Sequence, residues 1–115
     1  MKTSYFGKLK SIDMGKYFPV SIAVGNRFYT GYKFPALAPT WDMVKAAKSG
    51  DKEYYWSRYE KKLSMLDKKI VHDTIVSEAN GKEPVLLCWE KDVNCCHRKR
   101  VAEWLNEAGY NVTEL

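Results

Sequence analysis

The hydrophobic and polar positions of this chain predict four β-strands. Residues 3–6 are rich in strand-forming types, and residues 19–24 alternate apolar with small side chains. Residues 85–88 are apolar throughout, which is typical of a strand that is covered on both faces. A last short strand is expected at residues 110–113.

Apolar residues that recur three and four positions apart predict helices in the middle and near the end of the chain. The first helix begins at Trp41, with Thr40 as its N-cap, and ends at Gly50. Asp51 can cap a second helix, and Asp67 can open a third. The apolar stripes of the second, third and final helices are Trp56, Tyr59, Leu63 and Leu66; Val71, Ile75 and Ala79; and Val101, Trp104, Leu105 and Ala108.

The order of these elements is strand, strand, several helices, strand, helix, strand, and this order predicts an α/β fold. Segments 85–89, 96–108 and 110–113 form a strand–helix–strand crossover, a unit that is right-handed and gives parallel pairing. We therefore expect a small three-layer α/β domain with a short, mostly parallel sheet flanked by helices. A length of 115 residues buries one core, so residues 1–115 are expected to form a single domain.

The charge of the chain changes this picture only slightly. The formal net charge is +5, and a basic surface attracts phosphate groups, from nucleotides up to nucleic acid. Lysines on solvated helix faces, such as Lys61 and Lys62, explain the same surplus. The charge by itself therefore identifies no site.

Three further features of the sequence limit the classes of protein. No run of eighteen apolar residues occurs and the first residues lack the apolar stretch of a signal peptide, so no membrane segment is expected. The three cysteines, two of them adjacent, are a poor disulfide framework, which predicts a reduced, cytoplasmic protein. A glycine-rich phosphate loop and a dinucleotide fingerprint are both missing, so no cofactor is expected.

The chemically active side chains gather in one stretch, residues 84–98, which reads as a buried strand, a polar loop and the first turn of a helix. Glu90 emerges where the strand ends, and the helix starts with Cys96, His97 and Arg98. In open α/β sheets, ligands bind at the carboxyl ends of the strands. The position where such folds bind their ligands is therefore expected to hold a carboxylate, a thiol, an imidazole and a guanidinium.

Each of these side chains suits a chemical role. The free N–H groups and the dipole of a helix start stabilise a thiolate, which makes Cys96 a candidate nucleophile. His97 is a candidate general acid or base, and Glu90 can orient it, orient Arg98, or carry a second proton. The planar guanidinium of Arg98 suits a phosphate or a carboxylate, so we expect an anion pocket at this helix start.

Each side chain also has a structural interpretation. Cys88 is expected to be a small buried hydrophobe, and Cys95 to pack or to be merely tolerated. His97 can cap or pack, and Arg98 can simply pair with Glu90 to hold the loop. The sequence leaves these alternatives open.

Spacing disfavours two other kinds of site. Adjacent cysteines lack the Cys-x₂₋₄-Cys spacing that closes a tetrahedral zinc site, so no metal is expected. A cysteine-phosphatase loop needs an arginine six positions after its cysteine. At that distance Asn94 follows Cys88, and Ala102 follows Cys96.

Residues 25–39 predict a long irregular loop with many aromatic side chains, which is unusual unless the loop covers something. Arg27, Tyr29, Tyr32 and Lys33 supply cations and stacking surfaces suited to a base and a phosphate. The aromatic residues can equally cover one face of the sheet. The expected partner is a phosphate-bearing small molecule or nucleic acid.

Four motifs and their order resemble the hallmark block of the DUF488 family, the domain-of-unknown-function family 488. These motifs are Leu86-Leu-Cys-Trp-Glu-Lys, Cys96-His-Arg, Val101-Ala-Glu-Trp-Leu and Ala108-Gly-Tyr-Asn-Val. Segments 20–24, 32–41 and 54–66 are similar to the short members of the family, so the resemblance covers nearly the whole chain.

This resemblance implies a small Rossmann-like domain of a kind found mostly in bacteria, archaea and their viruses, with no established reaction. By motif match, Glu90, Cys96, His97 and Arg98 take the signature positions of the family. Cys95 departs from the pattern, which leaves open whether it shares the thiol role. We hypothesise an enzyme or ligand-binding domain whose anion pocket takes a nucleotide-related or nucleic-acid-related substrate. The alternative is a non-catalytic interaction or regulatory protein in which Cys-His-Arg is structural.

Overall fold

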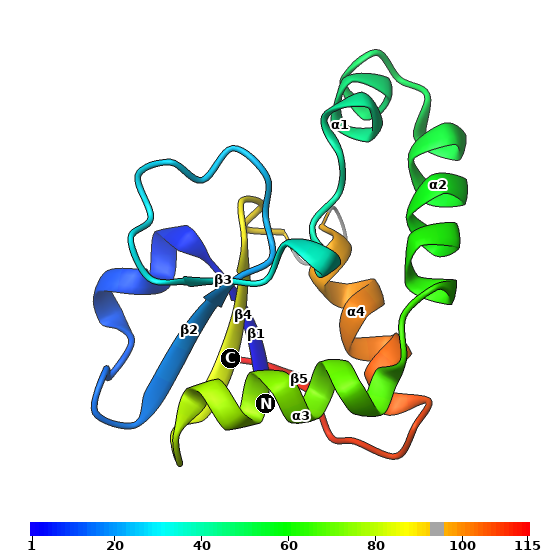
Figure 1. The fold of residues 1–115 in the computed structure, drawn as a ribbon. Helices are drawn as coiled ribbons and strands as arrows, with labels where there is room; N and C mark the ends of the chain where they lie inside the picture. Colours follow the sequence, from blue (N-terminus) through cyan, green and yellow to red (C-terminus); the bar gives the residue numbers. More distant parts are fainter. Residues whose placement is uncertain (93–95) are drawn as a thin grey trace.

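The computed structural model of the chain describes residues 1–92 and 96–115. The described residues form one five-stranded sheet in which all strand pairs are parallel, in the order β3-β2-β4-β1-β5 (Figure 1). The strands are β1 (Lys2–Tyr5), β2 (Tyr17–Ser21), β3 (Tyr32–Lys33), β4 (Glu83–Cys88) and β5 (Thr113–Glu114). The predicted α/β class with a parallel sheet is confirmed.

Four α-helices and two short 3₁₀-helices connect these strands. They are η1 (Phe6–Ser11), η2 (Pro35–Leu37), α1 (Trp41–Lys48), α2 (Lys52–Ser64), α3 (Lys68–Ala79) and α4 (His97–Asn106). Helices α1 and α2 pack side by side and rise beyond the carboxyl ends of the strands (Figure 1). Helix α3 packs on β2 and β4, and α4 packs on β1 and β4.

The order of the strands decides which face each connection covers. The β1–β2 and β2–β3 connections move toward the β3 edge, whereas the β3–β4 and β4–β5 connections move toward the β5 edge. Because parallel crossovers are right-handed, connections that move in opposite directions lie on opposite faces. The α-helices therefore cover one face, and η1 with the segment 22–31 covers the other, which gives three layers.

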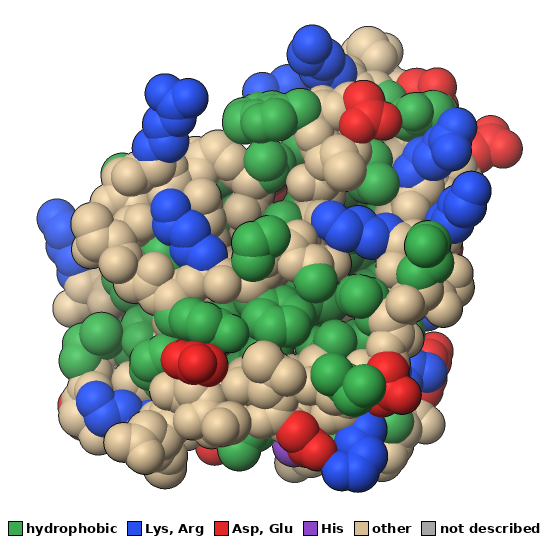
Figure 2. Space-filling view, in the orientation of Figure 1, with side chains coloured by type: hydrophobic (Ala, Val, Ile, Leu, Met, Phe, Trp, Pro, Cys, Tyr) green, Lys and Arg blue, Asp and Glu red, His purple; other side chains and the backbone are tan. Residues whose placement is uncertain are grey.

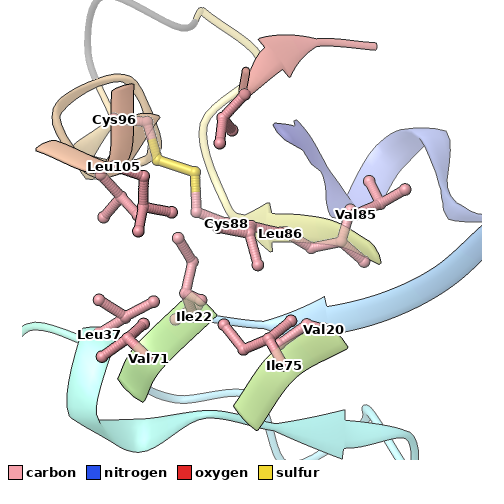
Figure 3. Packing of buried hydrophobic residues seen from close by; sticks show 14 of the residues in the cluster. Val20, Ile22, Leu37, Val71, Ile75, Val85, Leu86, Cys88, Cys96 and Leu105 are labelled. Carbon is pink, nitrogen blue, oxygen red and sulfur yellow. A yellow bond between two sulfur atoms is a disulfide. The ribbon is translucent and has the colours of Figure 1, made fainter. Parts of the chain in front are cut away.

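Strand β4 is the centre of the sheet because it pairs with both β1 and β2. Its residues 85–88 are at most 1% exposed, as their apolar character on both faces predicts. Val20, Ile22 and Leu86 belong to one buried cluster with Val71 and Ile75 of α3 (Figure 3). The predicted central, buried strand is therefore confirmed, and its carboxyl end delivers Glu90 to the surface.

The helix starts follow the polar residues that precede them. The Asp51 carboxylate accepts a hydrogen bond from the Tyr54 N–H, and the Asp67 carboxylate accepts one from the Ile70 N–H, both at 3.0 Å. Both predicted caps are confirmed. Thr40 occupies the N-cap position of α1, but its side chain makes no capping hydrogen bond.

Strands β2 and β5 differ most from their predicted bounds, whereas β1 and β4 differ by only one or two residues at an end. The final strand was expected at 110–113, but the side-chain amide of Asn106 bonds both backbone groups of Val112, and β5 starts only afterwards at Thr113–Glu114. Strand β2 was expected at 19–24, yet it spans Tyr17–Ser21, and its pairing with β4 ends at Ser21 opposite Leu87. The segment predicted as irregular, 25–39, contains β3 and η2.

The surface in the orientation of Figure 1 combines apolar and basic side chains. A band of hydrophobic side chains crosses this face, and Lys and Arg side chains stand around it (Figure 2). No helix in residues 1–92 and 96–115 has the length and apolar character needed to cross a membrane.

Candidate functional site

A pocket of about 640 Å³ lies beyond the carboxyl ends of β2 and β4. Its floor is formed by Ala23 and Val24 after β2, by residues 88–90 at the end of β4, and by the start of α4. The chain leaves β2 toward one face of the sheet and leaves β4 toward the other, so a crevice opens between these strand ends. This is the switch point at which parallel α/β sheets bind ligands.

The structure brings the three predicted catalytic residues into this pocket. Cys96, His97 and Glu90 all line it. Cys96 and His97 are each 5% exposed, so they form a recessed floor, whereas Glu90 is exposed at its edge. The carboxylate, the imidazole and the sulfur therefore face one volume.

The hydrogen bonds of His97 identify its tautomer. Nε2 lies 2.5 Å from the carbonyl oxygen of Ile22, and Nδ1 lies 3.7 Å from Sγ of Cys96. A carbonyl oxygen can only accept, so Nε2 carries the hydrogen of the neutral ring. The unprotonated Nδ1 then presents its lone pair to Cys96.

The buried position of His97 keeps its ring neutral. The pKa of His97 is lowered from 6.5 to about 4, mainly by burial and additionally by the positive charges of Arg98 and Lys62. The hydrogen bond to Ile22 acts in the opposite direction but does not offset burial. The His97 ring is therefore a neutral proton acceptor near pH 7, and a stable imidazolium–thiolate pair with Cys96 is disfavoured.

Cys88 and Cys96 are joined by a disulfide bond (Figure 3). Cys88 is 1% exposed, as expected of a buried small residue, but it is not a simple core residue. The interpretation of the cysteines as a poor disulfide framework is wrong for this pair. The reason is the fold: β4 ends at Cys88, α4 starts after Cys96, and both side chains lie at the floor of the same pocket.

The predicted anion ligand, Arg98, is an internal residue. Its side chain is fully buried and forms a salt bridge of 2.9 Å with the carboxylate of Glu114 in β5. It also donates to Sγ of Cys88 and to the backbone carbonyls of Glu90 and Lys91. The acidic partner of Arg98 is therefore Glu114, and Glu90 contributes its backbone oxygen instead of its carboxylate.

The ligand types for a metal ion occur together in the pocket floor. One ligand atom each from Cys88, Cys96 and His97 lies within 4.8 Å of the others. Two thiolates and an imidazole are a set that Zn²⁺ accepts, but both sulfurs must be free of the disulfide to bind it. Cys95 lies outside the described residues.

The structure does not bring the predicted loop residues into this pocket. Tyr29 is buried and donates its hydroxyl to the carbonyl of Pro19 at 2.8 Å, and burial raises its pKa to about 12. Tyr29 and Tyr32 line a second pocket of about 620 Å³, while Arg27 and Lys33 are exposed outside the first. Tyr29 therefore covers the sheet, as the alternative interpretation of the loop aromatics predicts.

Four aromatic side chains form the walls of the first pocket instead. Trp41 comes from α1, Tyr55 and Trp56 come from α2, and Trp89 follows β4. Trp41 and Trp89 are about half exposed, at 56% and 47%, which leaves their rings open to a ligand. The sequence pattern assigned Trp56 to an apolar helix stripe, and no local signal placed these rings together.

Charged groups surround the aromatic walls. Lys48 at the end of α1 and Lys52 at the start of α2 line the pocket and are exposed. Tyr55 has its pKa raised to about 12, mainly by burial and additionally by the negative charge of Glu90. The pocket therefore combines two cations at its rim with one carboxylate near Tyr55.

The parallel sheet has a layer on each face, and an aromatic pocket lies over a cysteine–histidine pair at its switch point. These features define a small Rossmann-like α/β protein. The family model described as the active DUF488-N3 subclade matches residues 13–109, and the chain belongs to the DUF488 family. No curated protein and no solved structure matches the chain. The family resemblance expected from the motifs is confirmed.

Proposed function

We propose that this chain is an enzyme that acts on a nucleotide unit, with Cys96 as its nucleophile and His97 as the base. The observation that carries the proposal is one pocket that holds Cys96, His97 and Glu90 beneath aromatic walls and a lysine rim. Its volume of about 640 Å³ lies within the range of small-molecule sites. The description of the matched family model as an active subclade also supports a catalytic role.

The walls suit a planar base and the rim suits a phosphate. Aromatic rings stack on any base, and such stacking contributes about 1–3 kcal/mol per base. Trp41 and Trp89 are open enough for this contact. Because Arg98 is buried in an ion pair, we assign the phosphate to Lys48 and Lys52, which are exposed at the same pocket.

The chemistry begins with the reduced Cys96 thiol. Nδ1 of His97 faces Sγ of Cys96 at 3.7 Å and has a free lone pair, so it takes the thiol proton. Since burial disfavours a charged imidazole, the pair stays neutral at rest, and the proton moves to Nδ1 only as the sulfur attacks the substrate and displaces its leaving group. Glu90 is the second group in the pocket that can exchange a proton with the substrate.

A second candidate function is a non-catalytic interaction protein in which Cys-His-Arg is structural. The contacts of Arg98 favour it, because its guanidinium ties the carboxyl end of β4 and the following loop to β5. In that case, neither the wild type nor the variants of the pocket walls bind a nucleotide, and Cys96 forms no adduct.

The test uses adenosine 5′-monophosphate and a short single-stranded oligoadenylate as probes, with the protein in reducing buffer at low salt. Tryptophan fluorescence reports binding, because Trp41, Trp56 and Trp89 line the pocket. We expect saturable quenching by the mononucleotide, and a much tighter response to the oligonucleotide identifies a nucleic-acid end as the source of the nucleotide. Intact-mass spectrometry then follows any adduct on Cys96, which the Cys96→Ser variant prevents.

Lysine variants supply matched controls for the binding measurement. Lys48→Gln and Lys52→Gln each weaken mononucleotide binding by about fivefold, since an exposed charge contact contributes about 1 kcal/mol or less. Lys45→Gln, on the same helix α1 but outside the pocket lining, leaves binding unchanged. Absence of quenching by both probes, or equal effects of Lys45→Gln and Lys48→Gln, contradicts the proposal.

A further inference from the structure

The disulfide at the pocket floor has different surroundings on its two sulfurs. Sγ of Cys96 faces His97 and the pocket, whereas Sγ of Cys88 accepts a hydrogen bond from the buried guanidinium of Arg98 at 3.1 Å. We propose that Cys88 and Cys96 are an exchangeable dithiol–disulfide pair. In this pair, an incoming thiolate attacks Cys96 from the pocket and Cys88 leaves as a thiolate held by Arg98.

The direction of attack follows from exposure. Cys96 is 5% exposed and Cys88 is 1% exposed, and Cys96 belongs to the turn that closes the pocket while Cys88 ends the buried strand β4. Attack on a disulfide requires the thiolate to reach the sulfur in line with the bond to the leaving sulfur. Both cysteines line the pocket, but Cys96 is the more exposed of the two, so the thiolate reaches Cys96 first.

The leaving group is selected by Arg98. A thiol leaves faster when its thiolate is stabilised, and a guanidinium at hydrogen-bond distance does this. Arg98 is held in place by Glu114 and by the backbone carbonyls of Glu90 and Lys91, so it stays beside Cys88 in either redox state. Arg98 therefore has a chemical role, which is to stabilise the Cys88 thiolate, and this role does not require it to bind an external anion.

The exchange conserves atoms and electrons. A thiolate RS⁻ attacks Cys96, the Cys88–Cys96 bond breaks, and the products are a Cys96–SR mixed disulfide and the Cys88 thiolate. A second thiolate R′S⁻ attacks the R sulfur, which releases RSSR′ and the Cys96 thiolate. Two thiols are oxidised and one disulfide is reduced, and the reverse sequence reduces a disulfide substrate while it re-forms the Cys88–Cys96 bond.

The consequence for catalysis rests on the proposed function. Cys96 can act as a nucleophile only when this disulfide is open, so thiols of the surroundings switch the enzyme on and disulfides switch it off. The exchange itself does not depend on that proposal, because it needs only the two cysteines and Arg98.

The test starts from a Cys95→Ser background, so that Cys88 and Cys96 are the only thiols, with a chelator present to remove metal ions. Peptide mass spectrometry after oxidation by glutathione disulfide is expected to find the Cys88–Cys96 bond. With Cys88→Ser added, glutathione disulfide forms a stable mixed disulfide at Cys96 in the folded protein and releases one glutathione. With Cys96→Ser added, Cys88 is modified at least tenfold more slowly. Absence of the Cys88–Cys96 bond, or faster modification of Cys88, overturns the proposal.

A second measurement tests the role of Arg98. Reduction of the disulfide by dithiothreitol is expected to slow at least tenfold in Arg98→Met and to be intermediate in Arg98→Lys, which keeps the charge. Arg100→Gln, whose native side chain pairs with Glu60 on the surface, reduces at the wild-type rate. If the disulfide of folded Arg98→Lys is reduced at the wild-type rate or faster, the role assigned to Arg98 is overturned. If Arg98→Met does not fold, the cysteine variants decide whether the pair exchanges.

These results are separable from those on function. If adenosine 5′-monophosphate binds to no form of the protein while exchange proceeds as described, the proposed function fails and the exchange pair stands. If adenosine 5′-monophosphate binds while no exchange occurs, the exchange pair fails and the binding site stands.

Discussion

The imidazole Nε2 of His97 donates a hydrogen bond to the backbone carbonyl of Ile22 over 2.5 Å. This bond joins the first residue of α4 to the residue that follows β2, although they are 75 positions apart in the sequence. It also aims the lone pair of Nδ1 at Cys96, so the same contact closes the fold and prepares the pocket floor.

The neutral state of His97 predicts a loss of stability in mild acid. In the folded protein the pKa of His97 is about 4, below its ordinary value of 6.5, so between these pH values the unfolded chain binds more protons. Stability from this group is full above pH 6.5 and decreases as the pH falls toward 4. The whole effect is on the order of 3 kcal/mol, because one pKa unit equals about 1.4 kcal/mol.

Urea unfolding of wild type and His97→Gln from pH 7.5 to 4 checks this prediction. Glutamine keeps a donor for Ile22 but does not titrate, so the difference in unfolding free energy between the two proteins shrinks as the pH falls. Carboxylates titrate in both proteins and cancel from the difference. A difference that does not change with pH shows that His97 is not held neutral.

The ion pair of Arg98 predicts a large difference between two neighbouring arginines. Arg98→Ala removes a fully buried guanidinium, which leaves Glu114 without its cation and two loop carbonyls without this donor, a loss of about 3 kcal/mol. The estimate is at the low end for a buried pair because the Glu114 side chain is 36% exposed and can be hydrated. Arg100→Ala breaks a partly exposed pair with Glu60 and costs about 1 kcal/mol or less.

Thermal and urea melts without ligand measure both arginine variants. A double variant, Arg98→Met with Glu114→Gln, is expected to recover part of the stability, because it removes the partner left without a charge. Equal melting temperatures for Arg98→Ala and Arg100→Ala exclude the structural role. A stabilisation of wild type by phosphate that Arg98→Ala abolishes restores the role of Arg98 as an anion ligand.

The sequence predicted the central strand and two helix starts because interactions between residues close in the sequence determine these elements. Strand β4 is apolar on both faces, and Asp51 and Asp67 bond amides three residues ahead, so each signal lies within a few positions. The convergence of Glu90 and Cys96 on one site followed from a general property of parallel sheets.

The parts that the sequence did not predict depend on contacts between distant segments. The Arg98–Glu114 pair spans 16 residues, and nothing near Arg98 distinguishes Glu114 from the nearer Glu90. The pocket walls combine Trp41 of α1 with Trp89 after β4, and only the path of the α1–α2 pair decides that they meet. Long-range packing of this kind leaves no periodic signal in a single sequence.

Gly25→Ala is expected to change the pocket wall at Trp41 without a large change in fold stability. Gly25 has a φ of +74°, and a Cβ atom there would lie 2.7 Å from the end of the Trp41 ring. Gly50 has a φ of +94° with nothing within 4 Å, so Gly50→Ala isolates the cost of the backbone conformation, about 1–2 kcal/mol. Gly25→Ala is expected to cost a similar amount, because the half-exposed Trp41 ring can move away.

Comparison of the two glycine variants separates backbone strain from the position of the ring. Both lower the melting temperature, but only Gly25→Ala shifts the tryptophan emission and weakens quenching by adenosine 5′-monophosphate. If Gly50→Ala changes the emission to the same extent, Trp41 does not rest on Gly25.

The last prediction concerns the charge that Glu90 places near Tyr55 at the pocket. The pKa of Tyr55 is raised to about 12, first by burial and then by the negative charge of Glu90. Glu90→Gln removes the second cause and keeps the first, so the pKa of Tyr55 falls but stays above 10. Tyrosinate absorbance during an alkaline titration measures it, with Tyr55→Phe in each background to assign the signal. Because the unfolded chain loses this proton near pH 10 and the folded chain near 12, Tyr55 makes stability fall as the pH rises through this window. That fall is smaller in Glu90→Gln, and an unchanged Tyr55 titration there means that the carboxylate faces away from Tyr55.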